Sequence, residues 1–272
     1  VRAASGMPRS WAIVTGAGSG IGAALTHRLL AAGVSVVAVG RRQSALDRTA
    51  TAAPTAKAAS LLTLAADIAS ADGQEAVCSA VPVDAELRFL IHNAAVGDPS
   101  PVGGKMDVDA FRYALEVNVV APLALTQALL PRLSAAGSGG GRVLHLGTGV
   151  AHAVQPGTGT YGISKLAFHR LYQQLSVDLQ GAGVWVGSAR PGVVPTEGMI
   201  DHVAKANELG LPHAEYFNRL FAEGGDGMQD VQVVAEFLWL LLTVCPAEEF
   251  GAQEWSVNQA TAWWSGSDKA HL

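Results

Sequence analysis

Short continuous apolar runs alternate with helical-length segments along most of the chain. The runs that predict strands are residues 11–15, 34–39, 61–66, 89–92, 142–148, 184–189 and 254–257. Helices are predicted at 20–32, 44–53, 71–80, 108–133 (interrupted by Pro122 and Pro131), 159–180, 201–223 and 229–244. Strands without polar alternation are typical of sheets buried on both faces, and strands alternating with helices indicate β-α-β units. The pattern therefore predicts an α/β fold, a single-domain doubly wound parallel sheet with helices on both faces.

No internal repeat or linker divides the chain. The Gly-Ser stretch at 137–141 is too short to separate two domains and reads as a surface turn. We expect one domain over residues 11–260, preceded by an N-terminal extension or cloning remnant at 1–10 and followed by a C-terminal tail at 261–272.

Composition narrows the class of protein. Of the 272 residues, 49% are apolar and 15% charged, which excludes a disordered chain. The net charge of −5 gives no basic excess for a nucleic-acid partner. The longest apolar stretches, 34–40 and 237–245, are shorter than the roughly 18 residues of a membrane span. Cys78 and Cys245 belong to no C-x-x-C motif and predict buried free thiols. We expect a cytoplasmic protein without a membrane partner.

A glycine-rich loop follows the first predicted strand and opens the first helix. Residues 15–22 read Thr-Gly-Ala-Gly-Ser-Gly-Ile-Gly, which fits T-G-x-x-x-G-x-G rather than G-x-G-x-x-G. Backbone N–H groups and the positive end of a helix bind a pyrophosphate, and glycines let it approach. Gly16 would form the tight turn, Gly20 would admit the phosphates and Gly22 would pack the helix on the sheet. Ser19 and Ile21 complete the expected cofactor contacts, and a plain glycine-rich turn is the alternative.

The second strand ends without an acidic residue. An acidic side chain there would bind the ribose 2′-hydroxyl of NAD, whereas Arg41 and Arg42 suit the 2′-phosphate of NADP(H). Arg41 lies nearer the expected ribose position, and the alternative is an arginine that caps a surface loop. Asp67 would accept a hydrogen bond from the adenine amino group, or else cap a helix.

Tyr161 and Lys165 stand at i and i+4 of a predicted helix and so share one face. A free phenol has a pKa of about 10, which a neighbouring ammonium and a positively charged nicotinamide would lower. Lowering it by ~3 units corresponds to about 4 kcal/mol, more than one lysine supplies easily. This spacing indicates a tyrosine acid/base, and ordinary surface residues of an amphipathic helix are the alternative.

Together and in this order, these motifs resemble those of the short-chain dehydrogenases/reductases. The resemblance rests on 15–22, Asp67, 92–95, Asn118, Tyr161 with Lys165, and 191–196. It implies a Rossmann fold in which Tyr161 protonates a carbonyl oxygen, and Lys165 binds the nicotinamide ribose and lowers the pKa of Tyr161. It also implies that Asn118 holds a water in a proton relay, and that Thr148, where the family usually has serine, bonds the substrate oxygen. Threonine keeps the hydroxyl but its methyl group crowds the pocket.

The resemblance adds further cofactor contacts. Besides Tyr161 and Lys165, these are Asn93, Ala94, Pro191, Gly192, Val194 and Thr196. Thr196 would bond the nicotinamide carboxamide, and Ala95 replaces a family glycine. No metal-ligand cluster such as H-E-x-x-H is present in the sequence, so no metal is expected.

A narrower resemblance points to the sepiapterin reductase/benzil reductase branch. It is carried by residues 118–123, 142–149, 190–194 and 250–255, while 194–197 departs from the expected acidic-Thr-Pro pattern. The implied activity is that of an NADP-dependent carbonyl reductase, an oxidoreductase transferring hydride from NADPH to a ketone or vicinal dicarbonyl of a small molecule. Oxidation of a secondary alcohol is the same chemistry reversed. An NADP-binding sensor or scaffold without turnover is the alternative, motivated by Thr148 and Ala95.

Two expectations concern the periphery of the site. Residues 195–228 would form a substrate lid hinged at its glycines 224, 225 and 227, with Met199 and Phe217 packing within it. The resemblance implies a homodimer or homotetramer that pairs the helices at 108–133 and 159–180.

Overall fold

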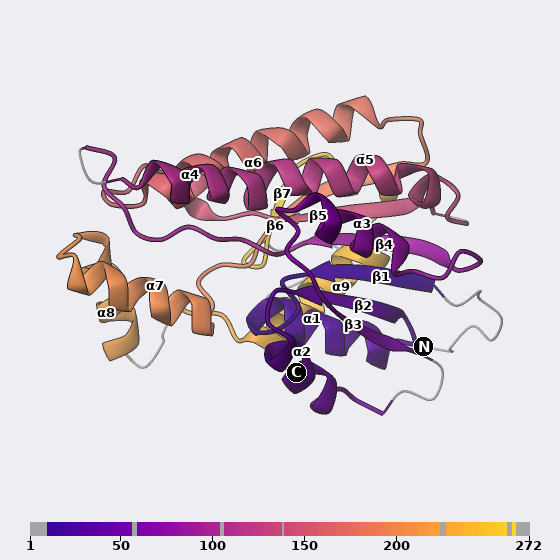
Figure 1. The fold of residues 1–272 in the computed structure, drawn as a ribbon, viewed down its shortest axis with the longest axis horizontal. Coiled ribbons are helices and arrows are strands. Elements are labelled where there is room, and N and C mark those ends of the chain that lie inside the picture. The colour runs from indigo at the N-terminus through magenta and orange to yellow at the C-terminus, as the bar shows by residue number, and fades with distance from the viewer. Residues whose placement is uncertain are drawn as a thin grey trace.

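Seven parallel strands form the centre of the molecule in the order β3-β2-β1-β4-β5-β6-β7 (Figure 1). The computed structural model describes residues 10–55, 59–103, 106–137, 139–223, 227–259 and 263–264. The strands are β1 Ser10–Thr15, β2 Ser35–Gly40, β3 Leu61–Ala65, β4 Glu86–His92, β5 Gly141–Leu146, β6 Val184–Arg190 and β7 Glu254–Ser256. The predicted doubly wound α/β fold is confirmed.

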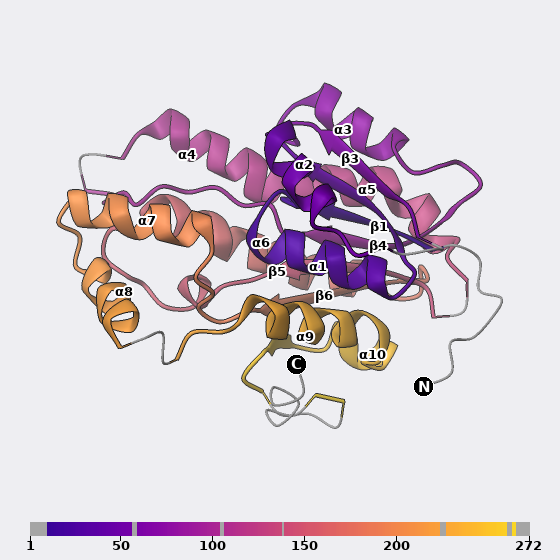
Figure 2. The same ribbon diagram turned by 90° about the horizontal axis from the view of Figure 1, so that it is seen from below.

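The helices cover both faces of this sheet, apart from α7 and α8, which lie beyond the edge where the strands end (Figures 1 and 2). They are α1 Gly20–Ala31, α2 Gln43–Thr51, α3 Ala71–Ser79, α4 Val108–Leu115, α5 Ala121–Ser134, α6 Gly159–Asp178, α7 Glu197–Glu208, α8 His213–Ala222, α9 Val231–Thr243 and α10 Ala247–Phe250. Short π and 3-10 turns stand at Glu116–Val120 (η1) and Gly149–Ala151 (η2).

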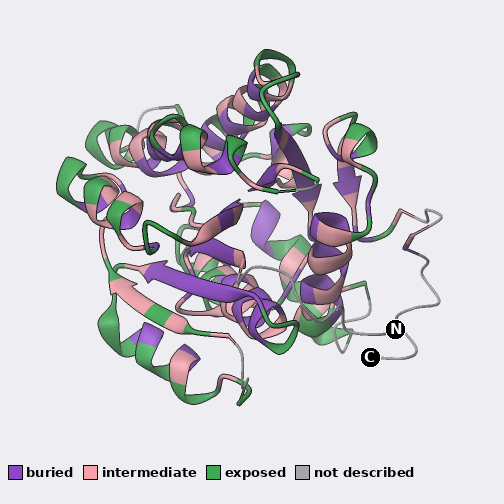
Figure 3. Ribbon diagram, turned by 90° about the vertical axis from the view of Figure 1, so that its right-hand side faces the viewer, coloured by how far each residue is buried: buried purple, intermediate pink, exposed green. Residues whose placement is uncertain are grey.

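Each face of the sheet has its own apolar core. Successive side chains of a strand point to opposite faces, so Ile13 packs beneath α3, α5 and α6, whereas Val14 packs beneath α1, α2 and α9. The central strands are consequently buried on both sides, as Figure 3 shows. This explains why their sequences read as continuous apolar runs.

The strand order reverses between β1 and β4, which are hydrogen-bonded neighbours. The chain first builds outward from β1 through β2 to β3, and then returns to build β4 through β7 on the other side. In a parallel sheet this reversal opens a crevice at the carboxyl ends of the strands, where ligands bind.

Several element boundaries differ from the prediction for local reasons. The 108–133 segment stays helical through both prolines, and its irregularity is instead the π turn η1. Pro122 lies in the first turn of α5, where proline is tolerated, whereas Pro131 lies inside the helix without breaking it. The predicted helix at 201–223 is two helices, α7 and α8. Helix α7 begins early because Thr196 caps it by accepting from Met199 N at 3.3 Å. Strand β5 ends at Leu146, so Thr148 lies beyond the strand.

The continuous helical stretch Val108–Ser134 is long and apolar enough to cross a membrane, although the longest unbroken apolar stretches of the sequence lie elsewhere, at 34–40 and 237–245. In this fold Leu125, Leu129 and Leu133 are fully buried in the core beside β4 and β5. The stretch therefore serves as a core helix here.

The two cysteines are free, as expected, but only Cys245 is fully buried, while Cys78 is half-buried. Burial raises the pKa of Cys78, and raises that of Cys245 to about 11.

Arg142 on β5 closes the end of α9. Its side chain donates to Leu241 O at 2.9 Å and to Cys245 O at 2.8 Å, carbonyls that the helix leaves unpaired at its C-terminus. We expect Arg142→Met to lower the free energy of unfolding by about 2–3 kcal/mol, because two buried carbonyls lose charged donors. Urea denaturation measures this, with Arg170→Met on exposed α6 surface as the control. A loss no larger than the control's would contradict the capping role.

Candidate active site

A cleft of about 640 Å³ opens at the carboxyl ends of the strands. Sixteen of the predicted site residues line it: Gly16, Ser19, Gly20, Ile21, Arg41, Arg42, Asp67, Asn93, Ala94, Thr148, Tyr161, Lys165, Pro191, Gly192, Val194 and Thr196. Gly22 and Asn118 are not among its lining residues. The sheet thus brings together segments that are far apart in the sequence.

The glycine-rich loop forms a cradle at the N-terminus of α1. Gly16 and Gly20 have φ of +67° and +53°, conformations that side chains rarely adopt. A Cβ on Gly20 would lie 2.8 Å from Thr196 Cγ2, which faces it across the cleft. Ser19 does not cap α1 with its side chain, and the first turn contains no acidic residue. These features fit the pyrophosphate of a dinucleotide.

Asn93 and Thr15 hold this cradle against β4. Asn93 Nδ2 donates to Thr15 O at 2.8 Å and to Gly16 O at 3.1 Å. Thr15 Oγ1 accepts from the backbone N–H groups of Asn93 and Ala94, both at 3.1 Å. A Cβ on Gly22 would collide with Gly16 O, so the absence of a side chain at Gly22 lets α1 lie close against this loop. The part played by Thr15 was missed, because its partners lie on another strand.

At the far end of the cleft, Tyr113 of α4 connects two predicted cofactor residues. Arg41 donates to the Tyr113 hydroxyl at 2.9 Å, and that hydroxyl donates to Asp67 Oδ2 at 3.0 Å. Burial and Asp67 raise the pKa of Tyr113. Asp67 is not the helix cap, since Ser70 caps α3. Sequence reasoning missed Tyr113, whose contact depends on how α4 packs.

Arg42 reaches the other side of the cleft. Its guanidinium lies 3.4 Å from Glu197 Oε2 at the start of α7, and both side chains are more than half exposed. An exposed pair of this kind contributes little stability, so Arg42 can be re-aimed toward a ligand at small cost.

Tyr161 and Thr148 form the centre of the site. Tyr161 stands in the first turn of α6 and lines the cleft together with Thr148. Burial raises the pKa of Tyr161, and the nearby Thr148 hydroxyl acts in the opposite direction. The resemblance implied that Lys165 lowers this pKa, but the net direction is upward, and the Lys165 ammonium donates to Leu146 O instead. The phenol is therefore protonated and ready to donate.

Lys165 is one helical turn further on and is 3% exposed. Its Nζ donates to Leu146 O at 2.6 Å and lies 4.3 Å from the centroid of the Phe168 ring. Burial lowers the pKa of Lys165 to about 7. A small change in the local field therefore decides whether this side chain is an ammonium at neutral pH.

Asn118 lies in the π turn η1 and clamps α6 to the loop after β4. Its Nδ2 donates to Val96 O at 2.7 Å and to Ser164 Oγ at 2.8 Å, while its Oδ1 accepts from Val96 N at 2.9 Å. These bonds leave the side chain one lone pair, so its role in a water relay stays a prediction. A π turn is frequent at functional sites.

The positions of a buried histidine and of the predicted lid complete the description of the cleft. His145 is fully buried and stacked on Phe168 with ring centroids 4.4 Å apart, the packing expected of a strand residue. Met199 and Phe217 of the predicted lid line the cleft, together with His202, which sequence reasoning missed. Of the predicted hinge, residues 224–226 lie outside the described residues, while Gly227 has a φ of +89°.

A family model described as short chain dehydrogenase matches residues 10–207. The chain belongs to the short-chain dehydrogenase family. A short chain dehydrogenase of Pseudocercospora fijiensis is 34% identical over 190 residues, covering 68% of this chain and 60% of the relative. Dehydrogenase/reductase SDR family member 4 of Bos taurus is 34% identical over 189 residues, covering 68% and 66%. The aligned stretch is therefore less than two thirds of the length of these two relatives.

Other members of the family differ in what their names say they act on. Sulfoacetaldehyde reductase of Chromohalobacter salexigens is 31% identical over 185 residues, covering 68% of this chain and 72% of the relative. The L-sorbose reductase of Gluconobacter frateurii, solved with NADPH and L-sorbose, has a TM-score of 0.77 at 22% identity and covers 92% and 95% of the two chains. The 3-ketoacyl-(acyl-carrier-protein) reductase of Brucella melitensis, solved with NADH, has a TM-score of 0.75 at 22% identity, covering 91% and 96%. These two structures share the fold of this short-chain dehydrogenase.

The cradle geometry makes a prediction about Gly20. Alanine there would be strained by the positive φ and would meet Thr196, so we expect Gly20→Ala to weaken dinucleotide binding at least ~10-fold, as about 1.4 kcal/mol would. Gly33→Ala is the matched control, because Gly33 has φ +86° with open space around it, at the other end of α1. Both variants should lose stability, but only the first should lose affinity in a fluorescence titration. Equal affinities would refute the cradle.

Proposed function

We propose that this short-chain dehydrogenase reduces the carbonyl of a small ketone or vicinal dicarbonyl, with NADPH as hydride donor. The observation that carries the proposal is the placement of the Tyr161 phenol and the Thr148 hydroxyl together in the cleft, with Lys165 one turn away on α6. A protonated phenol beside a second hydroxyl is suited to bind a carbonyl oxygen and protonate it.

Different residues of this chain carry out the separate steps of the proposed reduction. NADPH supplies the hydride when bound. Thr148 holds the substrate oxygen, and Tyr161 gives that oxygen its phenolic proton, so that one hydride and one proton convert the carbonyl to an alcohol. The phenolate left on Tyr161 is stabilised by the Lys165 ammonium once that group turns from Leu146 O. The apolar side chains of Met199 and Phe217 help to exclude water.

The preference for NADP(H) over NAD(H) rests on Arg41 and Arg42. Both line the cleft at the end of β2, and residues 40–42 carry no carboxylate for a ribose hydroxyl. A guanidinium forms charge-assisted bonds with a phosphate that the unphosphorylated cofactor cannot make.

The vicinal dicarbonyl class is proposed from the motifs at 118–123, 142–149, 190–194 and 250–255 alone. The cleft supports a small substrate with polar groups, because Gln155 and His202 stand among apolar lining residues. The names of the relatives, which include a sulfoacetaldehyde reductase, fit small polar carbonyl compounds of this kind.

We also propose a cytoplasmic homodimer or homotetramer without a membrane or nucleic-acid partner. The outer side of α6 exposes Ile163, Leu166 and Val177, and η1 exposes Val120. Burying these apolar side chains against a second copy would remove them from water, as pairing of α4, α5 and α6 requires.

The alternative is an NADP-binding sensor without turnover, motivated by Thr148 and Ala95. A Tyr161→Phe variant separates the two functions. We expect it to lose at least ~100-fold in kcat, because it removes the proton donor, and to keep its affinity for NADPH.

NADPH consumption would be followed with an aryl 1,2-diketone, a pterin diketone, an aliphatic ketone and a simple aldehyde. Tyr216→Phe, on an exposed residue of α8 that does not line the cleft, is the control. No turnover by the wild type with tight NADPH binding would favour the sensor.

Arg41→Ala and Arg42→Ala test the choice of cofactor. Each should raise the KM for NADPH about 10- to 100-fold, as the loss of about 1.5–3 kcal/mol implies, and leave the KM for NADH unchanged. Arg112→Ala on α4, whose side chain is exposed and pairs with Asp109, is the control. Parallel changes with both cofactors would contradict recognition of the 2′-phosphate.

A further inference from the structure

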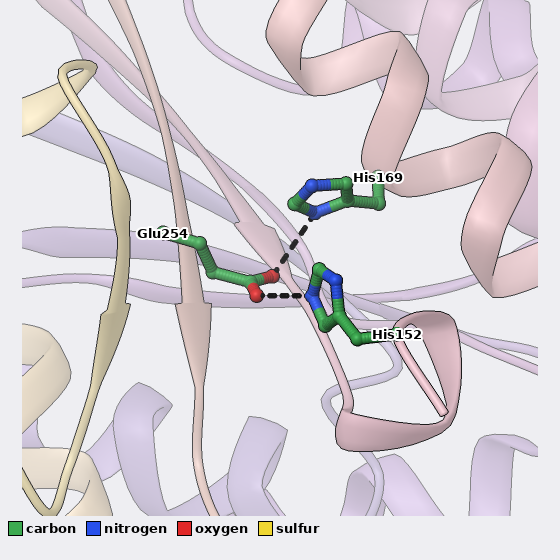
Figure 4. Close-up of side chains that lie close together, drawn as sticks. All are labelled: His152, His169 and Glu254. Atoms are coloured by element: carbon green, nitrogen blue, oxygen red, sulfur yellow. Dashed lines mark hydrogen bonds and ion pairs between the residues drawn. The ribbon is translucent and has the colours of Figure 1, made fainter.

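Glu254 of β7 carries a carboxylate that is nearly enclosed, with 7% of the side chain exposed. Ser188 Oγ donates to its Oε1 at 2.9 Å. Arg190 Nε lies 3.0 Å from its Oε2 as an ion pair without hydrogen-bond geometry. His152 Nε2 and His169 Nδ1 approach the two oxygens at 2.7 and 3.3 Å, as Figure 4 shows. Ser188 donates a hydrogen bond, Arg190 contributes a positive charge, and the imidazole nitrogens that face the ionised carboxylate would have to carry their protons.

This carboxylate packs on the end of β5 that also holds Lys165. A Cβ on Gly147 would collide with Glu254 Oε1, so the carboxylate lies directly over that glycine. The preceding residue, Leu146, accepts the Lys165 ammonium through its carbonyl oxygen. His169, which contacts Glu254, is one helical turn from Lys165 on the same face of α6. The two charged groups therefore flank a single stretch of backbone next to Thr148.

We infer that Glu254 is a positioning residue that supplies the counter-charge for the buried ammonium of Lys165. The inference rests on the proposed function, because it assigns Glu254 a role through Lys165 and not through contact with a substrate. An anion close to a desolvated ammonium favours its charged form. Glu254 would thereby keep Lys165 able to bind the ribose and to stabilise the phenolate of Tyr161.

The surroundings of Lys165 agree with this assignment. Burial lowers its pKa to about 7, and the charge of Glu254 raises it. His92 of β4 and His145 of β5 face it as neutral rings, because burial lowers the pKa of His92 to about 3 and that of His145 well below its ordinary value. Tyr172 is also neutral, since burial and Glu254 raise its pKa to about 12. Among the described residues, Glu254 is the anion that acts on Lys165.

The remaining charged or titratable groups contact the carboxylate of Glu254. Arg190 approaches it from β6, His152 from the loop after η2 and His169 from α6. Two imidazoles and a carboxylate, with ligand atoms within 4.8 Å of one another, are also a donor set for zinc. Here Ser188 and the guanidinium of Arg190 already occupy both oxygens, and a divalent cation would be repelled by that guanidinium. The contacts thus favour a carboxylate held by protein groups over a carboxylate that binds zinc.

Glu254→Gln keeps the shape of the side chain and removes its charge. The ammonium form is lost as the pH rises through the pKa of Lys165, so lowering that pKa moves the loss to lower pH. We expect the alkaline limb of kcat/KM for carbonyl reduction, and the alkaline loss of NADPH affinity, to move down by about one pH unit. Glu254→Asp, which keeps the charge, should recover part of the shift.

Two further variants distinguish the effect of the Glu254 charge from a general structural effect. Gly147→Ala should displace the carboxylate and move the limb in the same direction. Glu236→Gln is the control, because Glu236 is a half-buried carboxylate paired with Arg28, far from the cleft, and should leave the limb in place. Thermal unfolding of each variant reports folding separately.

Several outcomes would overturn the inference. A Glu254→Gln enzyme with lower kcat but an unmoved limb would show a structural role only. Saturable Zn²⁺ binding by the wild type that is lost in both Glu254→Gln and His152→Asn would assign the cluster to a metal. If no carbonyl substrate is reduced, the proposed function fails, but the pH dependence of NADPH binding still decides the inference. An unchanged binding profile in Glu254→Gln would refute it.

Discussion

Burial of the Lys165 ammonium is the constraint on which the catalytic half of the molecule depends. Removing such a charge from water costs several kcal/mol unless other groups replace the water. The replacements are the Leu146 carbonyl, the face of the Phe168 ring and the carboxylate of Glu254. Each comes from a different element, so β5, α6 and β7 must all be in place before Lys165 can be an ammonium near neutral pH.

The parallel sheet meets this requirement through the register of its strands. Leu146 ends β5, Ser188 lies near the end of β6 and Glu254 begins β7, and parallel pairing places all three at one level of the sheet, although they lie far apart in the chain. The same sheet holds the glycine cradle at the end of β1. The proposed sites of cofactor binding and proton transfer therefore share one rigid support, and the helices on the two faces of the sheet exclude water from its core.

The parts of this site that the sequence predicts are those whose partners are local. The spacing of Gly16, Gly20 and Gly22, and that of Tyr161 and Lys165, each lies within one loop or one helix turn. The bonds of Tyr113 to Arg41 and Asp67 join three distant elements, and their pairing depends on the order of the strands and the packing of α4. Helix ends were missed for a related reason, since a cap such as Thr196 is visible only once its backbone partner is known.

The histidines show how the role of one residue type depends on its environment. No ligand spacing connects them in the sequence, yet four of them gather around α6. His92 and His145 lie inside the core, where desolvation keeps them neutral, so they do not repel the nearby ammonium. His152 and His169 contact Glu254 at the start of β7, where they hold the negative charge of its carboxylate in place. Neutral rings together with a fixed anion are the conditions under which a buried lysine keeps its charge.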